Sequence, residues 1–208
     1  MGDTFGDGAQ DEKAVHKVCI DNFYLGRYEV TQRQWVEVMG NNPSIVICDD
    51  CPVERVSWYD AQEFLKRLNQ KTGGNYRLPA EAEWEYAARN GGKEEKYAGT
   101  SNEGELEEYA WYYDNSGNRT HPVGQKKPNG LGLYDMTGNV WEWVADWYDE
   151  NYYSRSPEWN PKGPDSGIGR VLRGGSCDFG PTIVRAAYRF GYYPDSRKLN
   201  FSGFRIAR

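Results

Sequence analysis

Helical periodicity is confined to the first 92 of the 208 residues, and this feature limits what the chain can fold into. Beyond it, short β-branched and aromatic segments alternate with Gly, Asn and Pro, which mark turns. The chain holds 24 Gly, and 15% of its residues are aromatic, which favours tight turns around a core of few, large side chains. We therefore predict one α+β domain over residues 1–208, with short helices and an irregular second half.

Two helices are predicted from hydroxyl residues that cap their N-termini. Thr31 precedes a helix over residues 32–39, which Gly40 ends. Ser57 precedes a second helix, in which Asp60 is the capping-box partner and apolar residues recur at helical spacing. One face of the second helix is therefore expected to be buried.

Three further segments complete the predicted organisation. Residues 18–30 read as a strand, a turn and a second strand, because β-branched and aromatic residues flank Asp-Asn and Gly. Pro79 is expected at the first position of a third helix that ends at Gly91-Gly92. Residues 93–108 are acidic and are predicted to form a solvated loop.

Charge and composition exclude several classes of function. The net charge of −6 argues against a nucleic-acid partner, which a basic face would bind. No run approaches the roughly 20 apolar residues of a transmembrane helix. The two histidines, His16 and His121, cannot supply a three-histidine metal site. The first residues lack the basic and apolar regions of a signal peptide, which leaves the protein's location open.

The four cysteines include one closely spaced pair, Cys48 and Cys51. No second cysteine pair or histidine pair is present to complete four zinc ligands. The two aspartates between these cysteines disfavour thiolate chemistry. A local disulfide or two free thiols in a loop is therefore favoured over a metal or redox site, and the choice between these two remains open.

Several motifs, taken together in their order and spacing, resemble the formylglycine-generating enzyme (sulfatase-modifying factor) superfamily. The resemblance covers nearly the whole chain and includes Arg-Leu-Pro-Ala-Glu-Ala-Glu-Trp, Gly-Asn-Val-Trp-Glu-Trp and Arg-Gly-Gly-Ser. It implies a C-type-lectin-like fold with short helices, small antiparallel sheets and much irregular structure. The residues that carry it lie at 28–31, 56–61, 76–89, 129–136, 138–143, 170–176 and 203–205.

The resemblance also implies a calcium site in the Gly-Asn-Val-Trp-Glu-Trp motif. Its ligands would be Asn139, the carbonyl of Val140 and Glu142, since calcium prefers oxygen ligands. The alternative is that Asn139 and Glu142 brace buried loop backbone, as buried polar groups must find partners. Calcium is thus a possible ligand, and no cofactor is required.

The family's catalytic residues cannot be carried over to this chain. Formylglycine generation uses two thiols shortly after Arg-Gly-Gly-Ser, because thiolates are the ligands that Cu(I) requires. Here Cys177 follows Ser176, and no other cysteine follows it in the sequence. We therefore expect no enzymatic activity of this kind.

Residues 177–202 have an unusual composition. They hold six aromatic residues but no Trp, Glu, Gln or Met, of which about four would be expected from the whole chain. These residue types, and Lys, cannot be encoded by an Asn codon whose adenines are mutagenised while its last base stays a pyrimidine. Lys198 is the one exception.

This pattern resembles the variable proteins of diversity-generating retroelements, some of which use the same superfamily scaffold. Their C-terminal segment has a fixed frame of Arg, Ala and Pro-Asp, and residues 170–208 fit it as a variable ligand-binding segment. Tyr and Phe offer large, stiff contact areas, and Ser, Gly and Asn offer adaptable polar contacts. The predicted variable residues are Asp178, Phe179, Thr182, Tyr188, Phe190, Tyr192, Tyr193, Ser196, Leu199, Asn200, Phe201 and Ser202.

The sequence therefore predicts a non-enzymatic recognition protein with a variable, aromatic binding surface. Its partner would be a protein or another surface ligand, and we expect a monomer at the cell surface or outside the cell. The alternatives are a formylglycine-generating-type oxidoreductase and a superfamily member that binds no ligand. The aromatic residues could also belong to the core, although so short a stretch cannot bury every ring.

Overall fold

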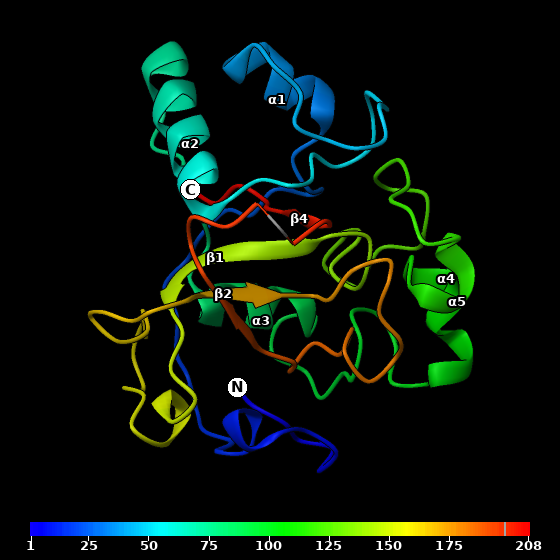
Figure 1. Cartoon of the computed structure of the whole chain (residues 1–208). Coiled ribbons are helices and arrows are strands. Elements are labelled where there is room, and N and C mark those ends of the chain that lie inside the picture. The colour runs from blue at the N-terminus through cyan, green and yellow to red at the C-terminus, as the bar shows by residue number, and fades with distance from the viewer. Residues whose placement is uncertain (198) are drawn as a thin grey trace.

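A four-stranded sheet forms the centre of the computed structural model, which describes residues 1–197 and 199–208 (Figure 1). The predicted α+β class is confirmed, whereas Lys198 lies outside the described residues. β1 pairs with β2 and β2 with β3 in antiparallel orientation, but β4 runs parallel to β1, so the sheet is mixed. The strands are β1 (Trp141–Trp147), β2 (Arg170–Arg173), β3 (Phe190–Tyr192) and β4 (Ser202–Gly203), in the order β3-β2-β1-β4.

Both faces of the sheet are covered. Side chains alternate between the two sides of a strand, so each strand contributes residues to both faces. Trp143 lies opposite Leu172, which in turn lies opposite Phe190, so these three side chains share one face. Val144 and Val171 belong to the other face and to a separate core cluster. The segment that supplies three of the four strands is also the predicted variable segment.

Helices α1 (Gln32–Met39) and α2 (Trp58–Thr72) pack on the face that carries Trp143 (Figure 1). Trp35 of α1 stacks on Phe64 of α2, with ring centroids 5.4 Å apart. The same cluster of buried residues includes Trp141, Trp143 and Leu172 of the sheet. The buried aromatic side chains therefore bind two short helices to a small sheet.

The predicted limits of α1 and the predicted start of α2 are confirmed. The Thr31 side chain accepts a hydrogen bond from Gln34, and Gly40 ends α1 with a φ of 81°. Ser57 and Asp60 form the reciprocal capping box of α2. These boundaries depend on hydrogen bonds within four residues, so local sequence determines them.

Helix α3 (Glu81–Ala88) covers the opposite face of the sheet, with Trp84 fully buried beneath it. The prediction that Pro79 opens this helix is wrong. Ala80 is the N-cap residue, and the carbonyl of Pro79 accepts a hydrogen bond from the backbone of Ala145 at 2.9 Å. This contact with β1 holds Pro79 outside the helix.

Two other predictions require correction. Residues 18–30 form isolated bridges rather than two strands, because Cys19 pairs with Trp159 and Leu25 with Ala207 instead of with each other. Residues 93–108 do not form a solvated loop throughout, since Tyr97 and Leu106 are fully buried. In both segments, partners distant in the sequence override the local pattern.

The remaining short elements surround this core. None of the helices in the described part of the chain is long and apolar enough to span a membrane. They are η1 (Gln10–Glu12), η2 (Glu103–Glu105), α4 (Leu106–Tyr109), α5 (Tyr113–Ser116) and η3 (Tyr152–Ser154).

Candidate binding surface

Trp141 of β1 forms the floor of an aromatic cluster. Its side chain is only 1% exposed. The rings of Phe179, Tyr188 and Phe190 surround it, with centroids 5.6, 5.9 and 5.4 Å from that of Trp141. Three predicted variable residues that are separated in the sequence therefore contact the same buried indole ring.

The cluster continues outward along β3. Phe190 and Tyr192 lie two residues apart on the same side of the strand, and their rings stack with centroids 5.7 Å apart. Tyr193 contacts Tyr192 at 6.0 Å and is 60% exposed. We call these five variable residues, together with Trp141, the aromatic platform.

The platform is half-buried rather than fully exposed. Phe179, Tyr188, Phe190 and Tyr192 each pack against the core cluster on one side. The sequence allowed two interpretations, a solvent-exposed surface and a buried core. These rings are partly buried and partly exposed, so neither interpretation describes them fully. An aromatic side chain held on one side presents a rigid surface on the other, which suits a contact with a ligand.

The other predicted variable residues differ in exposure. Thr182 and Asn200 are exposed, whereas Ser196, Leu199 and Phe201 are half-buried. The Asp178 carboxylate is half-buried and accepts a hydrogen bond from the Ser176 hydroxyl at 2.6 Å.

Ser202 must be removed from the candidate binding surface. It is fully buried in β4, and its hydroxyl hydrogen-bonds the carbonyls of Val56 and Leu199, each at 3.0 Å. Pairing of β4 with Trp141 places Ser202 inside the fold. The codon pattern could not predict this burial, because serine fits the pattern whether its side chain is exposed or buried.

Two frame arginines anchor the variable segment through buried ion pairs. Arg185 donates to both carboxylate oxygens of Glu12, at 2.7 and 2.9 Å. Arg189 binds both oxygens of Glu81 in the same way, at 2.6 and 2.9 Å. In both arginines burial lowers the pKa, but the carboxylate partners outweigh it and leave the pKa raised. The backbone between the variable positions is thus tied to the rest of the molecule.

A third frame arginine behaves differently from this pair. Arg197 pairs with Asp60 at the start of α2, but its side chain is 65% exposed. Arg197 therefore has a different environment from Arg185 and Arg189. Water surrounds its guanidinium group, so the ion pair contributes little to stability.

The residues of the implied calcium site do not fit a calcium ion. Both oxygens of Glu142 accept hydrogen bonds from Arg205, at 2.6 and 2.7 Å, and one also accepts from the Trp84 indole at 2.7 Å. The side chain of Asn139 donates to Glu29 and accepts from the backbone of His121. A bound cation would face the Arg205 guanidinium. Asn139 braces loop backbone, as the alternative expected, whereas Glu142 is bonded to the side chains of Arg205 and Trp84.

Replacing Glu142 with Gln should lower the free energy of unfolding by about 3–5 kcal/mol, because Arg205 would keep a buried, unpaired charge. Urea unfolding with millimolar calcium and with a chelator measures this effect. We expect the same loss in both. Stabilisation of the unmodified protein by calcium that disappears in Glu142→Gln would contradict our assignment.

The cysteines give one disulfide and two free thiols. Cys48 and Cys51 are bonded, which resolves the alternative left open by the sequence. Cys19 and Cys177 are free. Cys177 is fully buried, and burial raises the pKa of its thiol. In this environment Cys177 is a poor metal ligand, because a ligand must be the thiolate.

The whole chain, residues 1–208, matches the Sulfatase-modifying factor enzyme 1-like domain. The chain belongs to this family. It is 38% identical to the Formylglycine-generating enzyme of Streptomyces coelicolor, in a match that covers 100% of this chain and 85% of that protein. It is also 38% identical to the Chaperone protein LppX of Paenibacillus barcinonensis, over 63% of this chain and 64% of LppX. The chain thus spans slightly less than two thirds of the length of LppX.

Two solved structures share the fold of this family member. Treponema denticola variable protein 1 has a TM-score of 0.86 and 37% identity, and the match covers 92% of this chain and 86% of that one. PvdO from Pseudomonas aeruginosa has a TM-score of 0.82 and 28% identity, covering 99% and 88%. These similarities agree with both resemblances seen in the sequence, to sulfatase-modifying factors and to variable proteins.

Proposed function

We propose that this protein is a non-enzymatic recognition protein that binds ligands through the aromatic platform and the exposed Thr182 and Asn200 beside it. One observation carries the proposal. The variable rings form a continuous series over Trp141, while Arg185 and Arg189 between them are buried in ion pairs. Replaceable contact residues on a fixed backbone are what a variable binding surface needs.

The chemistry of the platform supports a macromolecular ligand. Tyr and Phe supply most of its area, and rigid aromatic rings give contact area at a small entropic cost. The similarity to Treponema denticola variable protein 1 points in the same direction. We expect a protein or another surface ligand, a monomeric protein, a location at the cell surface or outside the cell, and no required cofactor.

Tyr193→Ser should weaken the binding of a peptide selected against this protein at least tenfold, because a few aromatic residues dominate interface energies. The peptides come from a displayed random library, and titration calorimetry measures their affinity. Tyr24→Ser is the matched control, since Tyr24 is also exposed, at 78%, and lies outside the variable segment. Equal weakening by both substitutions, or by neither, would reject the proposed surface.

Formylglycine generation is the alternative function, favoured by the 38% identity to the enzyme of Streptomyces coelicolor. We expect no stoichiometric copper and no aldehyde on a cysteine-containing sulfatase peptide, because Cys177 is buried and has no downstream partner thiol. Cu(I) titration and mass spectrometry of the peptide test this. Tight Cu(I) binding that Cys177→Ser abolishes would favour the enzyme instead.

A further inference from the structure

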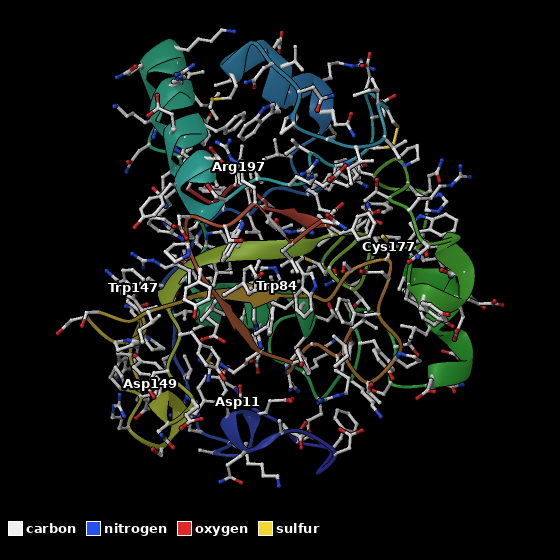
Figure 2. All side chains as sticks on the ribbon, viewed as in Figure 1. Asp11, Trp84, Trp147, Asp149, Cys177 and Arg197 are labelled. Carbon is white, nitrogen blue, oxygen red and sulfur yellow. A yellow bond between two sulfur atoms is a disulfide. The ribbon has the colours of Figure 1, made fainter. Side chains whose placement is uncertain are left out.

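Arg170, the first residue of β2, lies between two indole rings. Its guanidinium carbon is 4.0 Å from the ring centroid of Trp58 and 3.5 Å from that of Trp147. Nη1 donates to the carbonyl of Ala145 at 2.5 Å. Trp147 is labelled near one end of the sheet in Figure 2. Stacking on both sides and one hydrogen bond fix the plane of this cation.

Arg170 lacks the partner that the neighbouring arginines have. Of the seven arginines from residue 170 onward, five pair with a carboxylate, and only Arg170 and the terminal Arg208 have no such partner among the described residues. Burial leaves the pKa of Arg170 lowered even though Tyr59 and Asp146 act to raise it, whereas the pKa of each of those five is raised, with their carboxylate partners among the causes. Arg170 is thus a half-buried cation without a carboxylate partner among the described residues, on a chain with a net charge of −6.

The unused donors of Arg170 form the edge that holds carboxylates elsewhere in this protein. Arg189, Arg197 and Arg205 each use Nε and Nη2 to bind the two oxygens of one carboxylate. The Nε of Arg170 is buried without a hydrogen-bond partner, and its Nη2 bonds to none of the described residues. A buried donor without an acceptor costs free energy, which a ligand oxygen would recover when it displaces the atoms that cover Nε.

Arg170 adjoins the aromatic platform. It lies opposite Tyr192 in the pairing of β2 with β3. The backbone of Tyr59 donates to the carbonyl of Pro194, and the Tyr59 side chain is 53% exposed beside Trp58. Arg170, Trp58, Tyr59 and Trp147 lie outside residues 178–202, so every variant of the platform would keep them.

We infer that Arg170, with Tyr59, Trp58 and Trp147, forms a fixed subsite that binds an Asp or Glu side chain of a polypeptide ligand at the edge of the platform. The inference rests on the proposed function. Arginine matches a carboxylate with two parallel hydrogen bonds, and Trp, Tyr and Arg are the residues most enriched at the energetic centres of protein interfaces. The platform would determine which ligand binds, and the subsite would supply a contact common to all of them.

Selection of a displayed random peptide library against the immobilised protein tests the subsite. We expect at least a tenfold enrichment of peptides with an acidic residue next to an aromatic one, and we expect Arg170→Gln to abolish that enrichment. Arg197→Gln is the matched control, because it removes the same charge from an exposed arginine of the variable segment. If both variants lost the acidic preference, the preference would come from the net charge of the protein, and the inference would be overturned.

The same selection separates failure of the subsite from failure of the proposed function. Peptides that depend on Tyr193 but show no acidic preference would overturn the subsite and leave the platform intact. Peptides that do not depend on Tyr193 would overturn both.

A second measurement avoids any variant that fails to fold. Selected acidic peptides and their Glu→Gln counterparts are titrated into the unmodified protein, and NMR follows the arginine Nε–H signals. The acidic peptides should shift the Arg170 signal and the Gln peptides should not; equal shifts, or none, overturn the inference. Phosphate titrated in the same way should compete with the peptides only weakly, and strong competition would instead indicate a phosphate ligand.

Discussion

Arg189→Ala should lower the free energy of unfolding by about 3–5 kcal/mol, since the buried Glu81 carboxylate loses both hydrogen bonds from Arg189. Among the described residues, Glu81 then keeps only the 3.7 Å contact with Arg173 and the Tyr153 hydroxyl as side-chain partners. The guanidinium group of Arg189 binds both oxygens of Glu81 and the carbonyls of Asp11 and Asp149. It also lies 4.0 Å from the ring centroid of Tyr153. The substitution therefore disconnects β3 from three separate parts of the chain. Urea unfolding followed by tryptophan fluorescence measures the loss.

Arg197→Ala is the control for this experiment. Arg197 belongs to the same segment, but its ion pair with Asp60 is exposed. Exposed pairs contribute at most about 1 kcal/mol, so this variant should unfold close to the unmodified protein. If both variants lost the same stability, the buried network would not be what anchors the variable segment.

Trp141→Ala should cost about 3–5 kcal/mol, because truncating a fully buried aromatic residue leaves a cavity. It should also loosen the platform, since Phe179, Tyr188 and Phe190 all rest on this ring. Tyr193→Ser should cost no more than about 0.5 kcal/mol, as expected for an exposed residue.

Substitutions of the half-buried rings should fall between these limits. Phe190→Ser should cost roughly 1–3 kcal/mol, because only part of the ring is removed from water in the native state. Denaturant midpoints of the three variants test the order Trp141, Phe190, Tyr193. A Tyr193 variant as unstable as the Trp141 variant would place the platform in the core and contradict its role in binding.

Local sequence was sufficient to predict several elements. The limits of α1 and α2 follow from Thr31, Gly40 and the Ser57–Asp60 pair, whose hydrogen bonds join residues close in the chain. The class of fold could be predicted from the family resemblance, which depends on motifs in order along the chain. The codon pattern at 177–202 identified the candidate surface, and all but Ser202 of its residues are at least partly exposed.

Contacts between distant residues decided the rest. Glu12 pairs with Arg185, 173 positions away, and Glu81 with Arg189, 108 positions away; no local pattern encodes these partners. Long-range contacts also explain the corrected predictions. The carbonyl of Pro79 bonds to β1, Ser202 is buried by the pairing of β4, and Glu142 binds Arg205 instead of a cation. The sequence by itself determined where α1 begins and ends and where α2 begins. Only the tertiary structure decided which rings remain exposed and which arginines pair with a carboxylate, because exposure and charge pairing depend on segments that meet only in the folded protein.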